Sequence, residues 1–207
     1  VTNEKDVVKN VKMIKKKFKR IDILINNAAT KTKKIKNFFN KFENYRYKDW
    51  KEIMNVNLDG AFLLSKEVSK VMIKQRSGNI ISIASIQGVV GNDKRLYKGS
   101  KINGIQMSSP AVYSASKSAL IGFTRYLSTY LGEYNIRVNC VVPGWIITER
   151  QKKLWLTPEV EEDQLKKQCI KRMLVPSDIS KAVLFFASDQ SSGCTAQNYI
   201  VDGGVVN

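Results

Sequence analysis

The segment GNIISIASIQG, from Gly78 to Gly88, limits what this chain can fold into more than any other segment. It is a short apolar run, rich in β-branched residues and bounded by glycines, and this pattern predicts a buried strand. Open α/β sheets hold their ligands at the carboxyl ends of such strands. The strand therefore brings Ser85 to a candidate binding edge, although a serine at such a position is also typical of a turn that caps its own backbone.

The segment PAVYSASKSALIGFTRYL predicts a long helix with a polar pair near its start. Its apolar residues recur at intervals of three and four positions and are Ala119, Leu120, Phe123, Leu127 and Leu131. Tyr113 and Lys117 are about one helical turn apart, so both side chains project from the same face. A phenol has a reference pKa of about 10, and a nearby ammonium lowers that pKa, which makes the tyrosine a usable acid or base. By itself, the pair is also what chance produces in a helix rich in Tyr and Lys.

A third segment, YKDWKEIMNVNLDGAFLLSKEVSKVMIKQ, predicts another long helix. The residues of its inward face are Trp50, Ile53, Met54, Asn57, Ala61, Ser65 and Val68. Asn57 stands on a face that should be apolar, and a buried amide must find hydrogen-bond partners. It is therefore either a satisfied structural asparagine or a polar group held in a site. The chain has no histidine, which excludes Ser-His and zinc-His sites and leaves proton transfer to Tyr, Lys, Asp, Glu or Cys.

Together these segments resemble the short-chain dehydrogenase/reductase family, along the whole chain and in the family's order. Residues 26–29 match the family's Asn-Asn-Ala-Gly element, with Ala29 in place of the usual glycine. The family's catalytic asparagine, serine, tyrosine and lysine correspond to Asn57, Ser85, Tyr113 and Lys117. RVNCVVPGWIIT resembles the sixth strand with its Pro-Gly turn, and YIVDGG resembles the last strand.

The resemblance implies a role for each site residue. Tyr113 exchanges a proton with the substrate oxygen, and Lys117 lowers the pKa of that phenol and hydrogen-bonds the nicotinamide ribose. Ser85 holds the substrate oxygen, and Asn57 positions a water that links Lys117 to solvent. The residues implied for cofactor binding are Asn27, Ala28, Ala29, Tyr113, Lys117, Pro143, Gly144, Ile146 and Thr148. Those implied for the substrate are Ser85, Gln87, Tyr113 and Trp145. The cofactor is NAD or NADP and no metal is implied, while a Pro-Gly turn is also what any plain reversal of the chain uses.

The N-terminal part of the family's pattern has no counterpart in this sequence. Family members begin with a strand, a glycine-rich turn and a helix that bind the cofactor diphosphate, and no Gly-x-x-x-Gly-x-Gly occurs here. Residues 1–29 instead predict the end of the third strand, a helix and the fourth strand. The apolar stripe of that helix is Val7, Val8, Val11, Ile14 and Phe18.

We therefore expect one domain over residues 1–207, with an α/β, Rossmann-like, doubly wound parallel sheet. It lacks the first two βαβ units, about 60 residues, and keeps strands four to seven side by side. These residues alone are expected to be inactive. The residue that separates NAD from NADP lies in the absent part.

Composition sets further limits. With 207 residues and 43% hydrophobic content, the chain can form one domain with a sizeable core. No apolar run approaches the roughly 20 residues of a membrane span, and no signal peptide is visible. Cys140, Cys169 and Cys194 are isolated, which indicates neither a disulfide framework nor a metal site. We expect a cytoplasmic protein without a membrane partner, and the resemblance implies a homodimer or homotetramer formed through two long helices and the last strand.

The formal net charge of +17 is compatible with a nucleic-acid or an acidic partner. The segment from Lys31 to Lys48 interleaves lysines with aromatic residues, as platforms for base stacking do. Those aromatic residues are Phe38, Phe39, Phe42, Tyr45 and Tyr47. The lysines, however, lie on the polar faces of every predicted helix, and proteins that contact bases and phosphates favour Arg. We therefore expect no nucleic-acid partner.

Residues 89–110 form an insertion between the serine and the tyrosine, so both its ends are anchored at the candidate site. Its basic residues Lys94, Arg95, Lys98 and Lys101 favour an anionic substrate, such as a sugar acid or a nucleotide-linked sugar, unless they are solvated loop residues only. The insertion resembles that of bacterial members encoded with surface-sugar and flagellin-glycan biosynthesis. Residues 148–172 resemble the lid of aldose dehydrogenases.

We therefore expect an NAD(P)-dependent oxidoreductase that interconverts a secondary alcohol, or a sugar hydroxyl, and a carbonyl. Its expected substrate is a carbohydrate or a sugar-derived small molecule. One alternative is a 3-oxoacyl-[acyl-carrier-protein] reductase, whose acidic partner suits a basic surface. The other is a non-catalytic fragment that acts only through oligomer contacts.

Overall fold

A computed structural model describes residues 1–91, 101–102, 104–106, 108, 110–154 and 156–206. Its strands are β1 (Ile23–Asn26), β2 (Gly78–Ile83), β3 (Lys101–Ile102), β4 (Ile105–Gln106), β5 (Ile136–Pro143) and β6 (Asn198–Val201). Its α-helices are α1 (Glu4–Phe18), α2 (Ile35–Phe38), α3 (Tyr47–Met54), α4 (Gly60–Gln75), α5 (Ala111–Leu131), α6 (Glu149–Leu154), α7 (Pro158–Lys167) and α8 (Pro176–Ala187). None of the helices in these ranges is long and apolar enough to cross a membrane.

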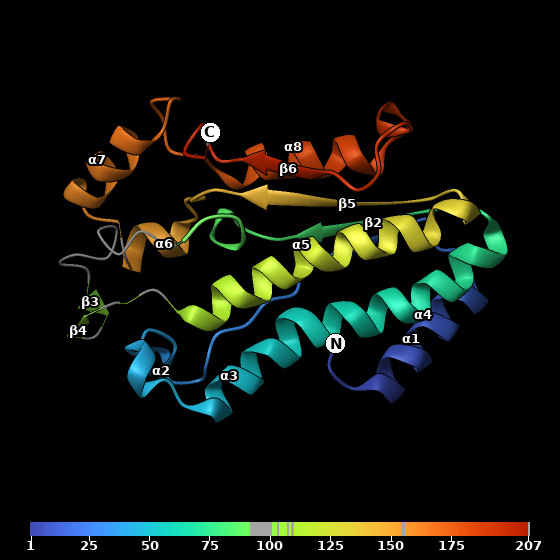
Figure 1. Ribbon diagram of the computed structural model, residues 1–207, viewed down its shortest axis with the longest axis horizontal. Coiled ribbons are helices and arrows are strands. Elements are labelled where there is room, and N and C mark those ends of the chain that lie inside the picture. The colour runs from blue at the N-terminus through green and yellow to red at the C-terminus, as the bar shows by residue number, and fades with distance from the viewer. Residues whose placement is uncertain (92–100, 103, 107, 109, 155, 207) are drawn as a thin grey trace.

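The centre of the molecule is a four-stranded parallel sheet in the order β1-β2-β5-β6. Ile25 pairs with Ile81 between β1 and β2, and Ser82 pairs with Cys140 between β2 and β5. Because the strands are parallel, their carboxyl ends meet at one edge, on the left of Figure 1. This is the order expected for strands four to seven of the family, and the predicted α/β fold class is confirmed.

Helices cover the two faces of the sheet unequally. On one face α5 packs over β2 and β5, α4 packs over β1 and β2, and α1 packs against α4 (Figure 1). The buried residues of this cluster are Val7, Val11, Val68, Val71, Met72, Ile80, Leu127, Leu131, Ile136 and Val138. On the other face α8 packs through Phe186, which shares a cluster with Ile81 and Val141. On that same face Ile23 and Ile25 of β1 are 43% and 45% exposed, so the described residues leave this part of the sheet open.

Local signals explain where α1 begins and ends. The Asn3 side chain accepts a hydrogen bond from the Asp6 amide at 3.2 Å and caps the helix. The helix stops where Lys19 adopts a left-handed conformation with φ 69°. Residues 1–3 are not part of a strand, so the prediction that the chain opens with the end of a strand is wrong. The physical reason is that no described strand pairs with residues 1–3, and Val1 lies instead beside Gly60 of α4.

The predicted apolar stripe of α1 is buried only in its first half. Val7 and Val11 pack in the main core, and Val8 is half-buried. Ile14 and Phe18, by contrast, are 40% and 60% exposed. The stripe was predicted correctly as a helical period, but the described residues provide no neighbour that covers its C-terminal end.

The predicted long helix from Tyr47 to Gln75 contains a wider turn in its middle. α3 and α4 are joined by a π turn at Asn55–Asp59, in which the Gly60 amide donates to the carbonyl of Asn55, five residues earlier. The inward face continues through this turn. Its buried members are Ile53, Asn57, Ala61, Ser65 and Val68, and its half-buried members are Trp50 and Met54.

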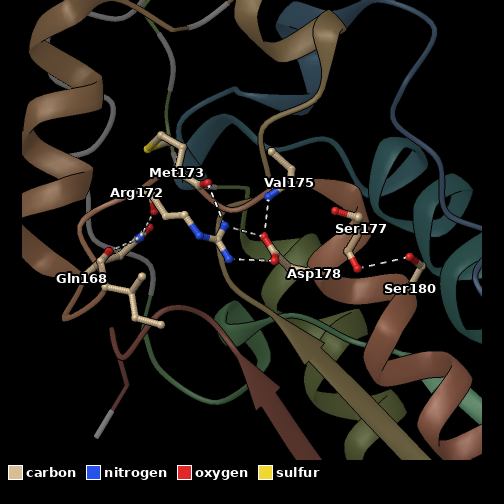
Figure 2. A network of polar contacts seen from close by, with 8 residues as sticks. Gln168, Arg172, Met173, Val175, Ser177, Asp178 and Ser180 are labelled. Atoms are coloured by element: carbon tan, nitrogen blue, oxygen red, sulfur yellow. Dashed lines mark hydrogen bonds and ion pairs between the residues drawn. The ribbon is translucent and has the colours of Figure 1, made fainter.

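Short elements gather beyond the carboxyl ends of the strands. α2, the β3–β4 hairpin, α6 and α7 all lie at that end of the molecule in Figure 1. The segment after α7 is fixed to the start of α8, because Arg172 donates to both carboxylate oxygens of Asp178 at 2.8 Å (Figure 2). Asp178 also accepts a hydrogen bond from the Val175 amide at 2.9 Å. The guanidinium and this amide hold the pKa of Asp178 at about 2.

The aromatic residues between Lys31 and Lys48 do not form one exposed platform. Phe38 and Phe39 are buried, with their rings in edge-to-face contact at a centroid distance of 4.9 Å. Phe42 and Tyr47 are 77% and 71% exposed. Part of this aromatic segment therefore belongs to the hydrophobic core.

Candidate active site

Tyr113 and Lys117 lie in the first turns of α5, which begins after Pro110. Lys117 is only 4% exposed, and its Nζ lies 5.7 Å from the centroid of the Tyr113 ring. Nζ also donates a hydrogen bond to the carbonyl of Ile83, the last residue of β2, at 2.7 Å. The two side chains are therefore neighbours, and the lysine is anchored to the strand that leads to Ser85.

Burial lowers the pKa of Lys117 to about 8, an effect that the nearby Cys140 opposes. Burial also raises the pKa of the Cys140 thiol to about 11. At pH 7 the lysine is therefore largely charged and the thiol is neutral. A buried ammonium beside a phenol favours the phenolate form. This is the electrostatic arrangement that acid–base catalysis by Tyr113 requires.

Ser85 follows β2 and caps the short 3₁₀ turn at Ile86–Gly88. Its Oγ accepts a hydrogen bond from the amide of Gln87 at 3.2 Å, and the residue is 7% exposed. The turn is seated on α5, because the Ser118 hydroxyl donates to the carbonyl of Gly88 at 2.8 Å. The interpretation of Ser85 as a turn cap is thus confirmed, and the same turn places this serine beside the first half of α5.

Gly88 makes this close packing possible. A Cβ at position 88 would lie 2.7 Å from the carbonyl carbon of Lys117 and 2.8 Å from the amide nitrogen of Ser118. Both atoms belong to the backbone of α5, so they can move away only if the helix moves. The sequence predicted Gly88 as a strand boundary. No sequence signal indicated that its missing side chain sets the distance between the turn at Ile86–Gly88 and α5.

Asn57 lies at the centre of the π turn and is 1% exposed. Its Oδ1 accepts a hydrogen bond from the backbone amide of Thr30 at 2.9 Å, and its Nδ2 donates to the hydroxyl of Ser116 at 3.2 Å. The interpretation as a satisfied structural asparagine is therefore confirmed. Asn57 joins the loop after β1 to α5, and its role in holding a water stays a prediction.

The loop after β1 carries Asn27, Ala28 and Ala29, which are all exposed at the carboxyl edge of the sheet. The amide of Asn27 donates to the carbonyl of Ile25 at 3.1 Å, so the chain turns directly after the strand. Ala29 does not adopt a positive φ, and its Cβ therefore causes no backbone strain where the family carries a glycine.

The turn after β5 brings two chain segments very close together. The Gly144 amide donates to the carbonyl of Val201 at 2.9 Å, just after Pro143 ends the strand. A Cβ on Gly144 would lie 2.6 Å from the Cα of Asp202. This close approach explains the glycine as a structural residue, and the reversal of the chain lies at the same edge as Ser85 and Asn27.

The residues that follow lead from this turn into α6. Ile146 pairs with Leu174 in an isolated bridge, and the Thr148 hydroxyl hydrogen-bonds Oε1 of Gln151 at 2.8 Å. Trp145 is half-buried. Apart from Tyr113 and Lys117 of α5, the candidate cofactor residues therefore lie at or after the ends of β1 and β5, on either side of β2.

Of the residues expected to contact substrate, Gln87 is half-buried in the turn after Ser85. Lys94, Arg95 and Lys98 of the insertion lie outside the described residues. Lys101 is exposed in β3, which pairs antiparallel with β4. The preference for an anionic substrate therefore stays a prediction.

The fold and the site define a Rossmann-like α/β protein with a Tyr-x-x-x-Lys pair, a half-buried tyrosine and a buried lysine, at the carboxyl edge of its sheet. Residues 1–206 match the sequence model of the family described as Enoyl-(Acyl carrier protein) reductase. The chain belongs to the short-chain dehydrogenase/reductase family.

Individual relatives agree with this assignment. The chain is 37% identical over 185 residues to the probable galactose dehydrogenase GalD of Rhizobium meliloti, a match that covers 89% of the chain and 64% of that protein. It is 34% identical over 207 residues to the 3-oxoacyl-[acyl-carrier-protein] reductase FabG of Thermotoga maritima, covering 100% of the chain and 74% of that protein.

Solved structures agree as well. A crystal structure of a short chain dehydrogenase from Leptospira borgpetersenii with bound NAD+ superposes with a TM-score of 0.83 at 33% identity. The match covers 99% of this chain and 72% of that one. The chain thus spans between 64% and 74% of the length of these three proteins.

Proposed function

We propose that this site carries the acid–base chemistry of an NAD(P)-dependent oxidoreductase, which interconverts a secondary alcohol and a carbonyl. The observation that carries the proposal is the buried ammonium of Lys117 beside the Tyr113 ring, held by the carbonyl of Ile83. Among the described residues no carboxylate forms an ion pair with Lys117. A buried, unpaired charge destabilises a fold, so its presence is typical of a functional lysine.

Four residues carry the proposed chemistry. Tyr113 gives a proton to the substrate oxygen, or takes one from it, and Lys117 lowers the pKa of the phenol. Ser85 holds the substrate oxygen, and Asn57 positions the water that connects Lys117 to solvent. A bound nicotinamide cofactor, NAD or NADP, accepts or supplies the hydride.

The described residues fit the nicotinamide end of such a cofactor. The loops after β1 and β5 present backbone at the carboxyl edge, and the ammonium of Lys117 is hydrogen-bonded to the end of β2, the strand that follows β1 in the sheet and precedes β5. The residues proposed to hold the cofactor are Asn27, Ala28, Ala29, Tyr113, Lys117, Pro143, Gly144, Ile146 and Thr148. The sequence contains no glycine-rich turn for the diphosphate, so we expect weak dinucleotide binding from these residues alone.

We propose a carbohydrate or sugar-derived substrate, with Ser85, Gln87, Tyr113 and Trp145 around it. Similarity to a probable galactose dehydrogenase supports this choice. The alternative is a 3-oxoacyl-[acyl-carrier-protein] reductase, which similarity over the whole chain and the charge of +17 favour. All three cysteines are unpaired, which supports a reducing, cytoplasmic location.

We also propose assembly as a homodimer or homotetramer. Phe62, Tyr126 and Tyr130 expose 48%, 61% and 55% of their surface on α4 and α5, and Leu184 and Tyr199 expose 66% and 50% on α8 and β6. The third possible function is that of a non-catalytic subunit, which would act only through these oligomer contacts. Sedimentation velocity of the chain tests the assembly, and a monomer at micromolar concentration contradicts it.

The acid–base role is tested with Tyr113→Phe in the chain fused to the N-terminal segment of the Thermotoga maritima reductase. The substitution should reduce turnover by at least about a hundred-fold. Calorimetric titration with NADH and NADPH should stay nearly unchanged, because the phenol acts on the substrate oxygen and the cofactor is held mainly by the other residues. Lys117→Met should damage both. Substantial hydride transfer by Tyr113→Phe would overturn the assignment.

The substrate is tested with the same fusion and a small panel. We expect oxidation of D-galactose or a related aldose with NAD+ or NADP+ to exceed reduction of an acetoacetyl thioester. The opposite ranking would favour the acyl-carrier-protein reductase. Activity on neither, with intact dinucleotide binding, would favour a non-catalytic subunit.

A further inference from the structure

Ser116 lies one residue before Lys117 and makes hydrogen bonds in two directions. Its hydroxyl donates to the carbonyl of Tyr113 at 2.9 Å, and its oxygen accepts from Nδ2 of Asn57 at 3.2 Å. Serines inside helices commonly make the first kind of bond, to a carbonyl three or four residues earlier. The second bond is different, because it joins α5 to the π turn, 59 positions away in the chain.

The chemistry of the groups fixes the direction of each bond. The Thr30 backbone N–H can only donate, so the atom of Asn57 that lies 2.9 Å from it must be the carbonyl oxygen Oδ1. Nδ2 can only donate and therefore faces Ser116. The Ser116 oxygen accepts this bond, which leaves the hydroxyl hydrogen for the carbonyl of Tyr113. One polar chain thus runs from Thr30 through Asn57 and Ser116 to Tyr113 without a change of direction.

Burial makes this chain of bonds sensitive to the loss of any member. Asn57 and Ser116 are 1% and 0% exposed, so water cannot easily replace a missing partner. A buried amide hydrogen without an acceptor is unfavourable, and a network with one unsatisfied member tends to rearrange. Loss of the Ser116 hydroxyl should therefore change the orientation of Asn57 and, through Asn57, release the amide of Thr30.

We propose that Ser116 is a positioning residue that couples the loop at 27–30 to the backbone of Tyr113. The loop that is proposed to contact the cofactor and the phenol that is proposed to move the proton are then held in one fixed relation. This inference rests on the proposed function for the role of Tyr113, and it goes beyond that function by assigning a residue outside the catalytic set.

The matched control is Ser128, on the same helix. It is 4% exposed, and its hydroxyl donates to the carbonyl of Arg125, three residues earlier, at 2.7 Å. Ser116→Ala and Ser128→Ala therefore remove the same kind of local bond from the same helix. Only Ser116→Ala also removes the acceptor of Asn57.

The first readout is amide hydrogen exchange of Thr30 by NMR, in the 207-residue chain without any ligand. Ser116→Ala should reduce the protection of this amide about ten-fold, as expected for loss of one hydrogen bond, whereas Ser128→Ala should leave it unchanged. Thr30 has no hydrogen bond with either serine, so a purely local effect on α5 would not reach it.

The second readout is the ring carbon signal of Tyr113 in protein labelled with ¹³C-tyrosine, identified by its loss in Tyr113→Phe. Its pH titration should shift in Ser116→Ala and stay at the wild-type position in Ser128→Ala. If both serine variants behave alike, or if Thr30 keeps its protection in Ser116→Ala, the coupling is overturned.

If Ser116→Ala does not fold, Ser116→Cys replaces it, because a thiol keeps a weak donor and acceptor in nearly the same volume. Intermediate protection of Thr30 then supports the proposal, and wild-type protection overturns it. Neither readout needs cofactor or substrate. If the chain fused to the N-terminal segment transferred no hydride, the proposed function would fail, and the result on Ser116 would stay intact.

Discussion

Ile25 and Ile81 are partners on adjacent strands and on the same face of the sheet, yet their surroundings differ. Ile81 is 0% exposed, in a cluster with Phe186 of α8, whereas Ile25 is 45% exposed. On the opposite face, Leu24 and Ile80 of the same two strands both pack in the core beneath α4 and α5. The sheet is therefore covered on one face and partly open on the other.

This difference separates the buried part of the candidate site from its exposed part. Parallel sheets are normally covered on both faces, and an uncovered edge strand is prone to associate with other chains. Tyr113, Lys117 and the turn after Ser85 belong to the covered side, through α5. The loop at 27–29 follows the open strand. The bonds of Asn57 and Ser116 connect the two parts.

The largest expected effect tests the comparison directly. Ile81→Ala should lower the free energy of unfolding by about 2–5 kcal/mol, because it leaves a cavity under α8. Ile25→Ala should lower it by less than about 1 kcal/mol, because that side chain is already half in water. Urea unfolding of both variants measures the difference. Equal losses would mean that Ile25 is covered in solution.

On the covered side, Gly88→Ala should lower the free energy of unfolding by about 1–3 kcal/mol. The new methyl group would collide with the backbone of α5, and the turn that carries Ser85 would have to shift. Gly122→Ala is the control, because its Cβ would meet nothing within 4 Å. In that variant the free energy of unfolding should rise by about 0.5–1 kcal/mol, because alanine has a better helix propensity than glycine. A neutral Gly88→Ala would contradict the tight contact.

A pH-dependent effect is expected at Lys117. Its folded-state pKa of about 8 lies below the 10.5 of a free lysine, so the charged form is less favourable in the folded protein. Wild-type stability should therefore rise between about pH 8 and pH 10.5, whereas Lys117→Met lacks this rise. Relative to wild type, the free energy of unfolding of the variant should fall by roughly 2–3 kcal/mol from pH 7 to pH 10. The same comparison with exposed Lys9→Met should show no such trend.

The smallest effect concerns the cap of α8, on the partly open face. Asp178→Asn should destabilise the protein by about 1 kcal/mol at pH 7, since it removes a charged cap. The pKa of Asp178 is lowered to about 2 in the folded protein, so its contribution is present above about pH 4 and is lost as the pH falls towards 2. Denaturation midpoints between pH 2 and pH 7 measure this, with exposed Asp163→Asn as the control. A difference that persists at pH 2 would argue against the ion pair.

Most of the sheet and the long helices could be predicted, because their signals are local. The β-branched run of β2 and the three- and four-residue spacing of α5 identify these elements by themselves, and the strand order followed from the family resemblance. The exposure of Ile14 and Phe18 could not be predicted, because it depends on which elements pack beside α1. β3 and β4 are two-residue strands, too short to show a period.

The candidate site divides in the same way. Tyr113 and Lys117 are four positions apart, so spacing alone predicts their contact, and the end of a strand marks Ser85. Gly88 and Ser116 carry no such mark. Their partners Ser118 and Asn57 lie 30 and 59 positions away, and these contacts exist only once the sheet has brought the segments together.

The π turn at Asn55–Asp59 holds one residue more than an ordinary helical turn of the same path. Deletion of Val56 should therefore leave the faces of α3 and α4 in phase, since each helical residue turns the chain by about 100°. Such a variant should remain folded by circular dichroism while Thr30 loses its protection against hydrogen exchange. One inserted residue would then decide whether Asn57 binds the loop at 27–30, while the fold itself stays the same. Evolution could therefore add or remove this contact without disturbing the fold.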